Sequence, residues 1–185
     1  PPLASRAPGS RIVTGGVSAM DRAAFLEHFG GVYEHSPWIA EQVFDTGLGP
    51  LTDTPSGLSA AMRDVVDQAG RESQWVLLRA HPDLVGRLAV SGGLTAASSA
   101  EQAGAGLDRC TPEEFNEFTE LNTRYSEKFG FPFIVAVRGL DRAGILERFC
   151  QRVEHDQDTE FNEALSQVHR IARLRIDDVF AQIRT

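Results

Sequence analysis

The chain of 185 residues has few of the features that mark membrane, secreted or nucleic-acid-binding proteins. No run of about 18 apolar residues occurs, which excludes a transmembrane helix. The net charge of −8 argues against a nucleic-acid surface, where a basic face is expected. Cysteine is scarce, and neither Cys110 nor Cys150 has neighbours at metal-ligand spacing. We therefore expect two reduced thiols in a cytoplasmic protein.

The motifs of common cofactor-dependent enzymes are also absent. The sequence holds no H-E-x-x-H pair, Walker phosphate loop, dinucleotide fingerprint or nucleophile elbow. We therefore expect no metal or nucleotide cofactor. A metal held by His81 and Asp83 stays open as an alternative, although two ligands in a short turn make a poor site.

What the chain does contain is typical of one globular domain, with 42% apolar and 24% charged residues. Residues 1–17 are rich in Pro, Gly and Ser and lack a hydrophobic signal core, so we expect a flexible N-terminal tail. Residues 18–185 are expected to form a single helical domain, since this length suffices for a core.

Apolar residues recur at helical spacing through nearly all of this domain. Ser18 and Thr111 carry helix-cap signals, and Gly130 carries a stop signal. The one strand-like run, Phe133 to Val137, has no partner strand and is expected to be a buried extended loop or a helix start. The expected fold class is all-α, with about eight helices. Their approximate ranges are 18–29, 36–46, 56–69, 72–80, 98–103, 111–130, 141–153 and 159–183.

His81 is the first candidate for chemistry. It ends the helix expected over 72–80, because the residue before Pro82 is pushed out of the α region. The negative end of the helix dipole favours an imidazolium there, which suits a proton donor. The alternative is a structural histidine at a helix end.

The second candidate is Ser98-x-x-Glu101, which follows a stretch rich in Gly, Ser and Ala. Its spacing matches a capping box, in which both side chains only satisfy backbone donors. Gln102 and the preceding stretch suit instead a site that closes over a small ligand. The residues alone leave both interpretations open.

The third candidate uses backbone. If Phe133 to Val137 are extended and buried, their N–H groups need acceptors. An anionic or oxo-bearing substrate could supply them, as in an oxyanion hole. Plain core packing is the alternative.

Arg175 is the last candidate. It falls on an otherwise apolar stripe of the last helix, formed with Ala164, Val168, Ile171 and Val179. An inward guanidinium needs an anionic partner, which could be a protein carboxylate or a substrate carboxylate. Arg152 is a weaker candidate for the same role, and Arg173 is expected to face water.

Several segments together resemble the OHCU decarboxylases, where OHCU is 2-oxo-4-hydroxy-4-carboxy-5-ureidoimidazoline. The resemblance covers roughly residues 20 to 180, and its motifs are specific in combination. The matching segments are Phe29-Gly30-Gly31-Val32-Tyr33-Glu34-His35-Ser36-Pro37-Trp38, Ala80-His81-Pro82-Asp83-Leu84, Ser98-x-x-Glu101-Gln102 with Ala105-Gly106-Leu107, Leu121-Asn122-x-x-Tyr125-x-x-Lys128-Phe129-Gly130-Phe131-Pro132-Phe133-Ile134, and Ile171-Ala172-Arg173-Leu174-Arg175-Ile176.

The resemblance implies an all-helical enzyme, typically a homodimer, that needs no cofactor and converts OHCU to (S)-allantoin and carbon dioxide in urate degradation. It implies that His81 is the catalytic acid and that Pro82 shapes the pocket beside it. Glu101 is a second catalytic candidate, which orients His81 or contacts the substrate. The implied substrate-binding residues are Pro82, Ser98, Ser99, Ala100, Glu101, Gln102, Phe133, Ile134, Val135, Ala136, Val137 and Arg175.

Two other functions stay open on the residues alone. A non-catalytic helical binding domain would use His81 and Glu101 as caps and Arg175 in an internal ion pair. A metal-dependent ureide hydrolase would place a metal near His81 and Asp83. The first tolerates substitution of His81, and metal analysis tests the second.

Overall fold

Residues 15–84, 106 and 110–183 are described by the computed structural model of the protein. Within these ranges the chain forms seven α-helices, two short 3-10 helices and no strand, which confirms the all-α fold class. The helix expected over 98–103 lies outside them. The elements are η1 (Val17–Ala19), α1 (Arg22–Phe29), α2 (Trp38–Thr46), η2 (Pro50–Asp53), α3 (Pro55–Gln68), α4 (Gly70–Ala80), α6 (Pro112–Phe129), α7 (Arg142–Arg152) and α8 (Gln157–Ile183).

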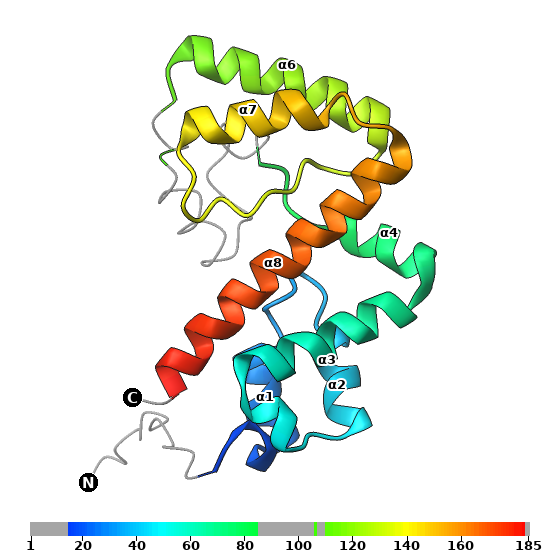
Figure 1. Ribbon diagram of the computed structural model, residues 1–185, viewed down its shortest axis with the longest axis vertical. Helices are drawn as coiled ribbons and strands as arrows, with labels where there is room; N and C mark the ends of the chain where they lie inside the picture. The colour runs from blue at the N-terminus through cyan, green and yellow to red at the C-terminus, as the bar shows by residue number, and fades with distance from the viewer. Residues whose placement is uncertain (1–14, 85–105, 107–109, 184–185) are drawn as a thin grey trace, which may run out of the picture.

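Helix α8, with 27 residues, is the scaffold of the molecule. It runs diagonally through Figure 1, with α1 to α3 at its C-terminal half, α6 and α7 at its N-terminal end, and α4 between them. Helices α1, α3, α4 and α6 all contact it. Side chains carried by α8 can therefore meet segments from distant parts of the sequence.

None of the helices in the described ranges is both long and apolar enough to cross a membrane.

Local signals define both ends of α6, as expected. The Thr111 hydroxyl accepts from the Glu114 N–H at 3.2 Å, and the Glu114 carboxylate accepts from the Thr111 N–H at 2.8 Å. Such a capping box stabilises a helix by about 1 kcal/mol. Gly130 ends the helix with a φ of 74°, a conformation that costs glycine little.

Ser18 does not begin a helix, so this prediction is wrong. Its backbone N–H and hydroxyl donate instead to the carboxylate of Asp53 in η2, at 2.7 and 2.8 Å. Asp21 caps α1 by accepting from the Ala24 N–H at 2.9 Å. Val17 is 1% exposed, so the packed core already includes the last residue of the expected tail.

The chain between α2 and α4 contains more helical structure than its Gly and Pro residues indicate. The loop expected over 47–55 contains η2, and α3 follows as expected. Gly70, which lies between the helices expected over 56–69 and 72–80, is the first residue of α4. Its φ of +81° lets the chain turn from α3 directly into α4.

Phe133 to Val137 are buried and form no helix, so of the two structures that the sequence left open they adopt the buried loop; Phe131 and the partly buried Pro132 lead into it. It joins α6 to α7 and is the yellow-green loop below α7 in Figure 1. Phe133 stacks on Phe149 with 3.9 Å between ring centroids, and Tyr125 meets Phe133 edge-on at 5.3 Å. Each buried ring stabilises the fold by about 1.5–3 kcal/mol, so aromatic packing holds the segment in place.

Candidate active site

His81 lies where the sequence predicts, at the C-terminal end of α4. It is the cap residue, with φ −69° and ψ 139°, and its N–H donates to the Leu78 carbonyl at 3.3 Å. This extended backbone is the one that Pro82 favours. The imidazole is partly buried and stands at the C-terminal end of α4, where the helix dipole is negative.

Hydrogen bonds of the residues on both sides of His81 connect this part of the chain to α6 and to Gly130, which directly precedes the Phe131–Val137 segment. On one side, Arg79 donates through Nε to the Gly130 carbonyl at 3.1 Å. On the other side, Asn122 of α6 donates through Nδ2 to the Asp83 carboxylate at 3.0 Å. Asp83 is thus engaged with an amide, and no cluster of three or more His, Cys, Asp or Glu suited to a metal occurs in the described ranges.

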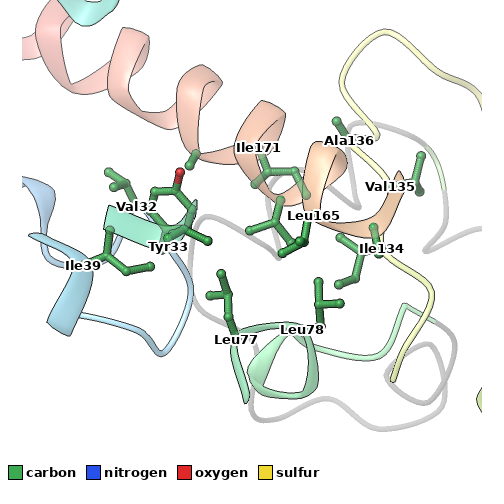
Figure 2. Packing of buried hydrophobic residues seen from close by; sticks show 14 of the residues in the cluster. Val32, Tyr33, Ile39, Leu77, Leu78, Ile134, Val135, Ala136, Leu165 and Ile171 are labelled. Carbon is green, nitrogen blue, oxygen red and sulfur yellow. The ribbon is translucent and has the colours of Figure 1, made fainter. Parts of the chain in front are cut away.

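The backbone of the Phe131–Val137 segment is bound by side chains from two helices. The Ala136 N–H donates to Gln167 Oε1 of α8 at 2.9 Å, and the Ile134 carbonyl accepts from Arg152 Nη1 of α7 at 2.6 Å. Figure 2 shows Ile134 above Leu78 of α4, with Leu165 of α8 beside them. One of the five amides expected to face a ligand therefore has a protein acceptor.

Arg175 is buried, as the apolar stripe predicts, and is 6% exposed. Its Nη2 lies 3.0 Å from Glu34 Oε2, and its Nη1 donates to the Val32 carbonyl at 3.5 Å. Arg173 is about 42% exposed and pairs with Asp177 on the same helix, as expected for an outward arginine. Arg175 thus pairs with a protein carboxylate among the described residues, which is one of the two kinds of partner that the sequence left open.

The structure therefore brings some of the predicted residues together. Arg79, two residues before His81, bonds to Gly130 just ahead of the Phe131–Val137 segment, and α8 contacts this segment through Gln167. Arg175 lies eight residues farther along α8, which corresponds to about 12 Å along the helix axis. Ser98, Ser99, Ala100, Glu101 and Gln102 lie outside the described residues.

Comparison with known proteins bears directly on this site. The OHCU decarboxylase family model matches residues 18–177, a range that contains every candidate residue. The chain belongs to the OHCU decarboxylase family. It is 42% identical to 2-oxo-4-hydroxy-4-carboxy-5-ureidoimidazoline decarboxylase of Haloferax volcanii over 165 residues, which cover 89% of this chain and 94% of that protein.

Two further relatives place the family domain within longer proteins. The uric acid degradation bifunctional protein of Bacillus subtilis is 36% identical over 90% of this chain, but the match covers only 32% of that protein. The crystal structure of an (S)-allantoin synthase superposes with a TM-score of 0.70 at 31% identity. This match covers 88% of the present chain and 52% of the synthase chain, so the chain spans about half of that protein.

In this family member, sequence reasoning does not reveal a buried polar network beside the Phe131–Val137 segment. Arg152 donates to Glu160 through Nε at 2.9 Å and through Nη2 at 2.5 Å. The Tyr125 hydroxyl also donates to Glu160, and His155 Nδ1 lies 2.9 Å from the same carboxylate. Burial, with the Glu160 charge, raises the pKa of Tyr125 far above its usual value. The network directs Arg152 toward the protein interior.

A second buried contact links the motif around Tyr33 to α8. The Tyr33 hydroxyl lies 2.8 Å from His169 Nδ1, and His169 Nε2 lies 3.9 Å from Asp67 Oδ1. Burial and, to a smaller extent, the Arg63 charge lower the pKa of His169 to about 4, against the opposing charge of Asp67. His169 is therefore neutral at pH 7, and its neutral ring can share a hydrogen bond with the Tyr33 hydroxyl.

Proposed function

We propose that this chain decarboxylates OHCU to (S)-allantoin and carbon dioxide in urate degradation, with His81 as the proton donor. The observation that carries the proposal is the position of His81 in a chain that matches the OHCU decarboxylase family along its domain. His81 stands at the C-terminal end of α4, and its neighbour Arg79 bonds to Gly130, which precedes the Phe131–Val137 segment. The uric acid degradation protein among the relatives supports the placement in urate breakdown.

The reaction needs charge stabilisation followed by one proton transfer. When the C–C bond to the carboxylate breaks, its electron pair stays on the ring carbon as carbon dioxide leaves. Delocalisation into the adjacent ring then spreads this charge, so an external electron sink is not required. Protonation of that carbon on one face by His81 gives a single stereoisomer.

The other substrate contacts are proposals as well. Backbone from Phe133 to Val137 would bind an oxygen of the ring or ureido group, as hydrogen-bond donors in an oxyanion hole do. Arg175 would contact the anionic substrate. Glu101 would orient His81 or bind the substrate, together with the residues at 98, 99, 100 and 102.

The assembly and compartment belong to the same proposal. The family resemblance supports a homodimer. The two cysteines, neither of them in a disulfide, support a reducing compartment such as the cytoplasm.

The test of this function compares the protein with its His81→Asn variant. OHCU is generated in situ from urate, a chelator is added, and circular dichroism follows the formation of optically active allantoin. We expect rapid formation with the original chain and a loss of about 10²- to 10⁴-fold with His81→Asn, the usual contribution of general acid catalysis.

His28→Asn on α1 is the matched control and should keep full activity. Thermal unfolding should be similar for all three proteins, because His81 ends a helix without filling the core. Normal (S)-allantoin formation by His81→Asn would remove His81 from the mechanism. An inactive original chain would favour the binding-domain alternative.

A further inference from the structure

We propose that the turn from Gly30 to Pro37 orients the Arg175 guanidinium for substrate, with Glu34 as the positioning residue. This inference rests on the proposed function, because it requires that Arg175 contacts the substrate. It assigns a role to the Gly30–Pro37 turn, which matches the sequence pattern of the family but contains none of the candidate catalytic residues.

The turn offers two acceptors to one guanidinium. Glu34 Oε2 lies 3.0 Å from Nη2 of Arg175, and the Val32 carbonyl accepts from Nη1 at 3.5 Å. The Glu34 side chain is 0% exposed and that of Arg175 is 7% exposed. Two acceptors from one short segment, meeting both terminal nitrogens, restrict rotation of the planar group.

The backbone of the turn is itself well defined. The Ser36 N–H donates to the Tyr33 carbonyl at 3.1 Å and closes the turn around Glu34. His35 has a φ of 54°, an uncommon conformation for a residue with a side chain, and it is exposed while Glu34 is buried. This conformation lets neighbouring residues point to opposite sides of the turn.

A second anchor fixes the turn against α8. The Tyr33 hydroxyl lies 2.8 Å from His169 Nδ1. Figure 2 shows Val32 and Tyr33 lying between Ile39 of α2 and helix α8, near Ile171. Because the turn is held at Tyr33 and packed on both sides, Glu34 reaches Arg175 from a fixed position.

Fixing a guanidinium before the substrate arrives favours binding. Long side chains lose rotamer freedom when a ligand immobilises them, and orientation in advance reduces this cost. A buried arginine–glutamate pair is by contrast a weak source of net stability. Orientation of Arg175 is therefore the property that this pair contributes to the site.

The experiment uses Glu34→Gln, which keeps the shape of the side chain and removes its charge. KM and kcat are measured by following OHCU consumption and (S)-allantoin formation, with thermal unfolding in parallel. We expect KM to rise about tenfold, a loss of about 1.4 kcal/mol in binding, with kcat within about twofold. Asp177→Asn is the control, because it removes the same charge from the exposed partner of Arg173.

A double-mutant cycle separates positioning from a merely structural role. In an Arg175→Lys background, Glu34→Gln should change KM much less than in the original chain, because the group it positions has been replaced. Multiplicative effects on KM, or an unchanged KM in folded Glu34→Gln, would overturn the inference. No (S)-allantoin formation by the original chain would instead overturn the proposed function, and the role of Glu34 with it.

Discussion

Two buried arginine–glutamate pairs with the same burial do different work in this protein. In both Arg152–Glu160 and Arg175–Glu34, the arginine side chain is 7% exposed and the glutamate side chain 0%. The first pair joins residues 8 positions apart, at the end of α7 and the start of α8. The second joins residues 141 positions apart and connects an N-terminal turn to the last helix. Equal burial therefore says little about what an ion pair connects.

The surroundings of the two guanidinium groups also differ. Arg152 lies over the Phe133 ring at 4.6 Å, and its carboxylate partner also meets Tyr125 and His155. Its bonds converge on one place in the core, next to the Ile134 carbonyl. The turn that meets Arg175 is held in place by separate contacts. We conclude that the Arg152 pair organises a local part of the core, whereas the Arg175 pair connects two segments that are distant in the sequence.

The largest expected effect comes from breaking the Arg152 pair. Arg152→Ala leaves the Glu160 carboxylate buried without its guanidinium, which costs about 3–5 kcal/mol of unfolding free energy. Urea denaturation of the variant and the original chain measures this difference. The double variant Arg152→Met with Glu160→Leu should lose less than Arg152→Ala, because no uncompensated charge remains. A single variant that costs under about 1 kcal/mol would show that the network does not organise the core.

A smaller effect, which depends on pH, tests the second anchor of the Gly30–Pro37 turn. Burial lowers the pKa of His169 to about 4 in the folded protein, against about 6.5 in an unfolded chain. The unfolded state therefore binds more protons between these values. Above pH 6.5 His169 is neutral in both states and the unfolding free energy keeps its full value. As the pH falls from 6.5 to 4, protonation of the unfolded chain lowers the unfolding free energy by up to about 1.4 kcal/mol per pH unit.

The measurement compares unfolding free energies of the original chain and His169→Gln between pH 7 and pH 4. Carboxylates titrate alike in both proteins, so the difference between the two curves isolates His169. We expect a steeper loss for the original chain. Parallel curves would mean that His169 takes up its proton without cost to the contact with Tyr33.

Features that depend on neighbouring residues could be predicted from the sequence. The Thr111 cap, the Gly130 stop and the extended backbone of His81 before Pro82 each depend on contacts within a few residues. The inward position of Arg175 followed from helical spacing, because a stripe of one helix meets the core as a unit. Such local rules position His81 and Arg175 on their helices but do not identify their partners.

Features that depend on tertiary packing could not be predicted. Glu160 lies in the first turn of α8, where an acidic residue is common because of the helix dipole, and nothing local shows that it is buried. Ser18 has a cap-like sequence, but Asp53 from another element accepts its hydrogen bonds. The pairing of Glu34 with Arg175 appears only when α8 lies across the N-terminal helices.

The smallest expected effect completes the comparison at the surface of the same helix. Arg173 donates through Nε to Asp177 at 3.1 Å, with both side chains more than two-fifths exposed. Water screens such a pair, so Arg173→Ala should change the unfolding free energy by no more than about 0.5 kcal/mol and leave KM unaltered. Arg175→Ala, two residues away, should lower stability and raise KM, because it leaves Glu34 buried without its guanidinium. Urea denaturation and steady-state kinetics of both variants decide the matter, and equal effects would contradict the argument that burial and long-range pairing distinguish the two arginines.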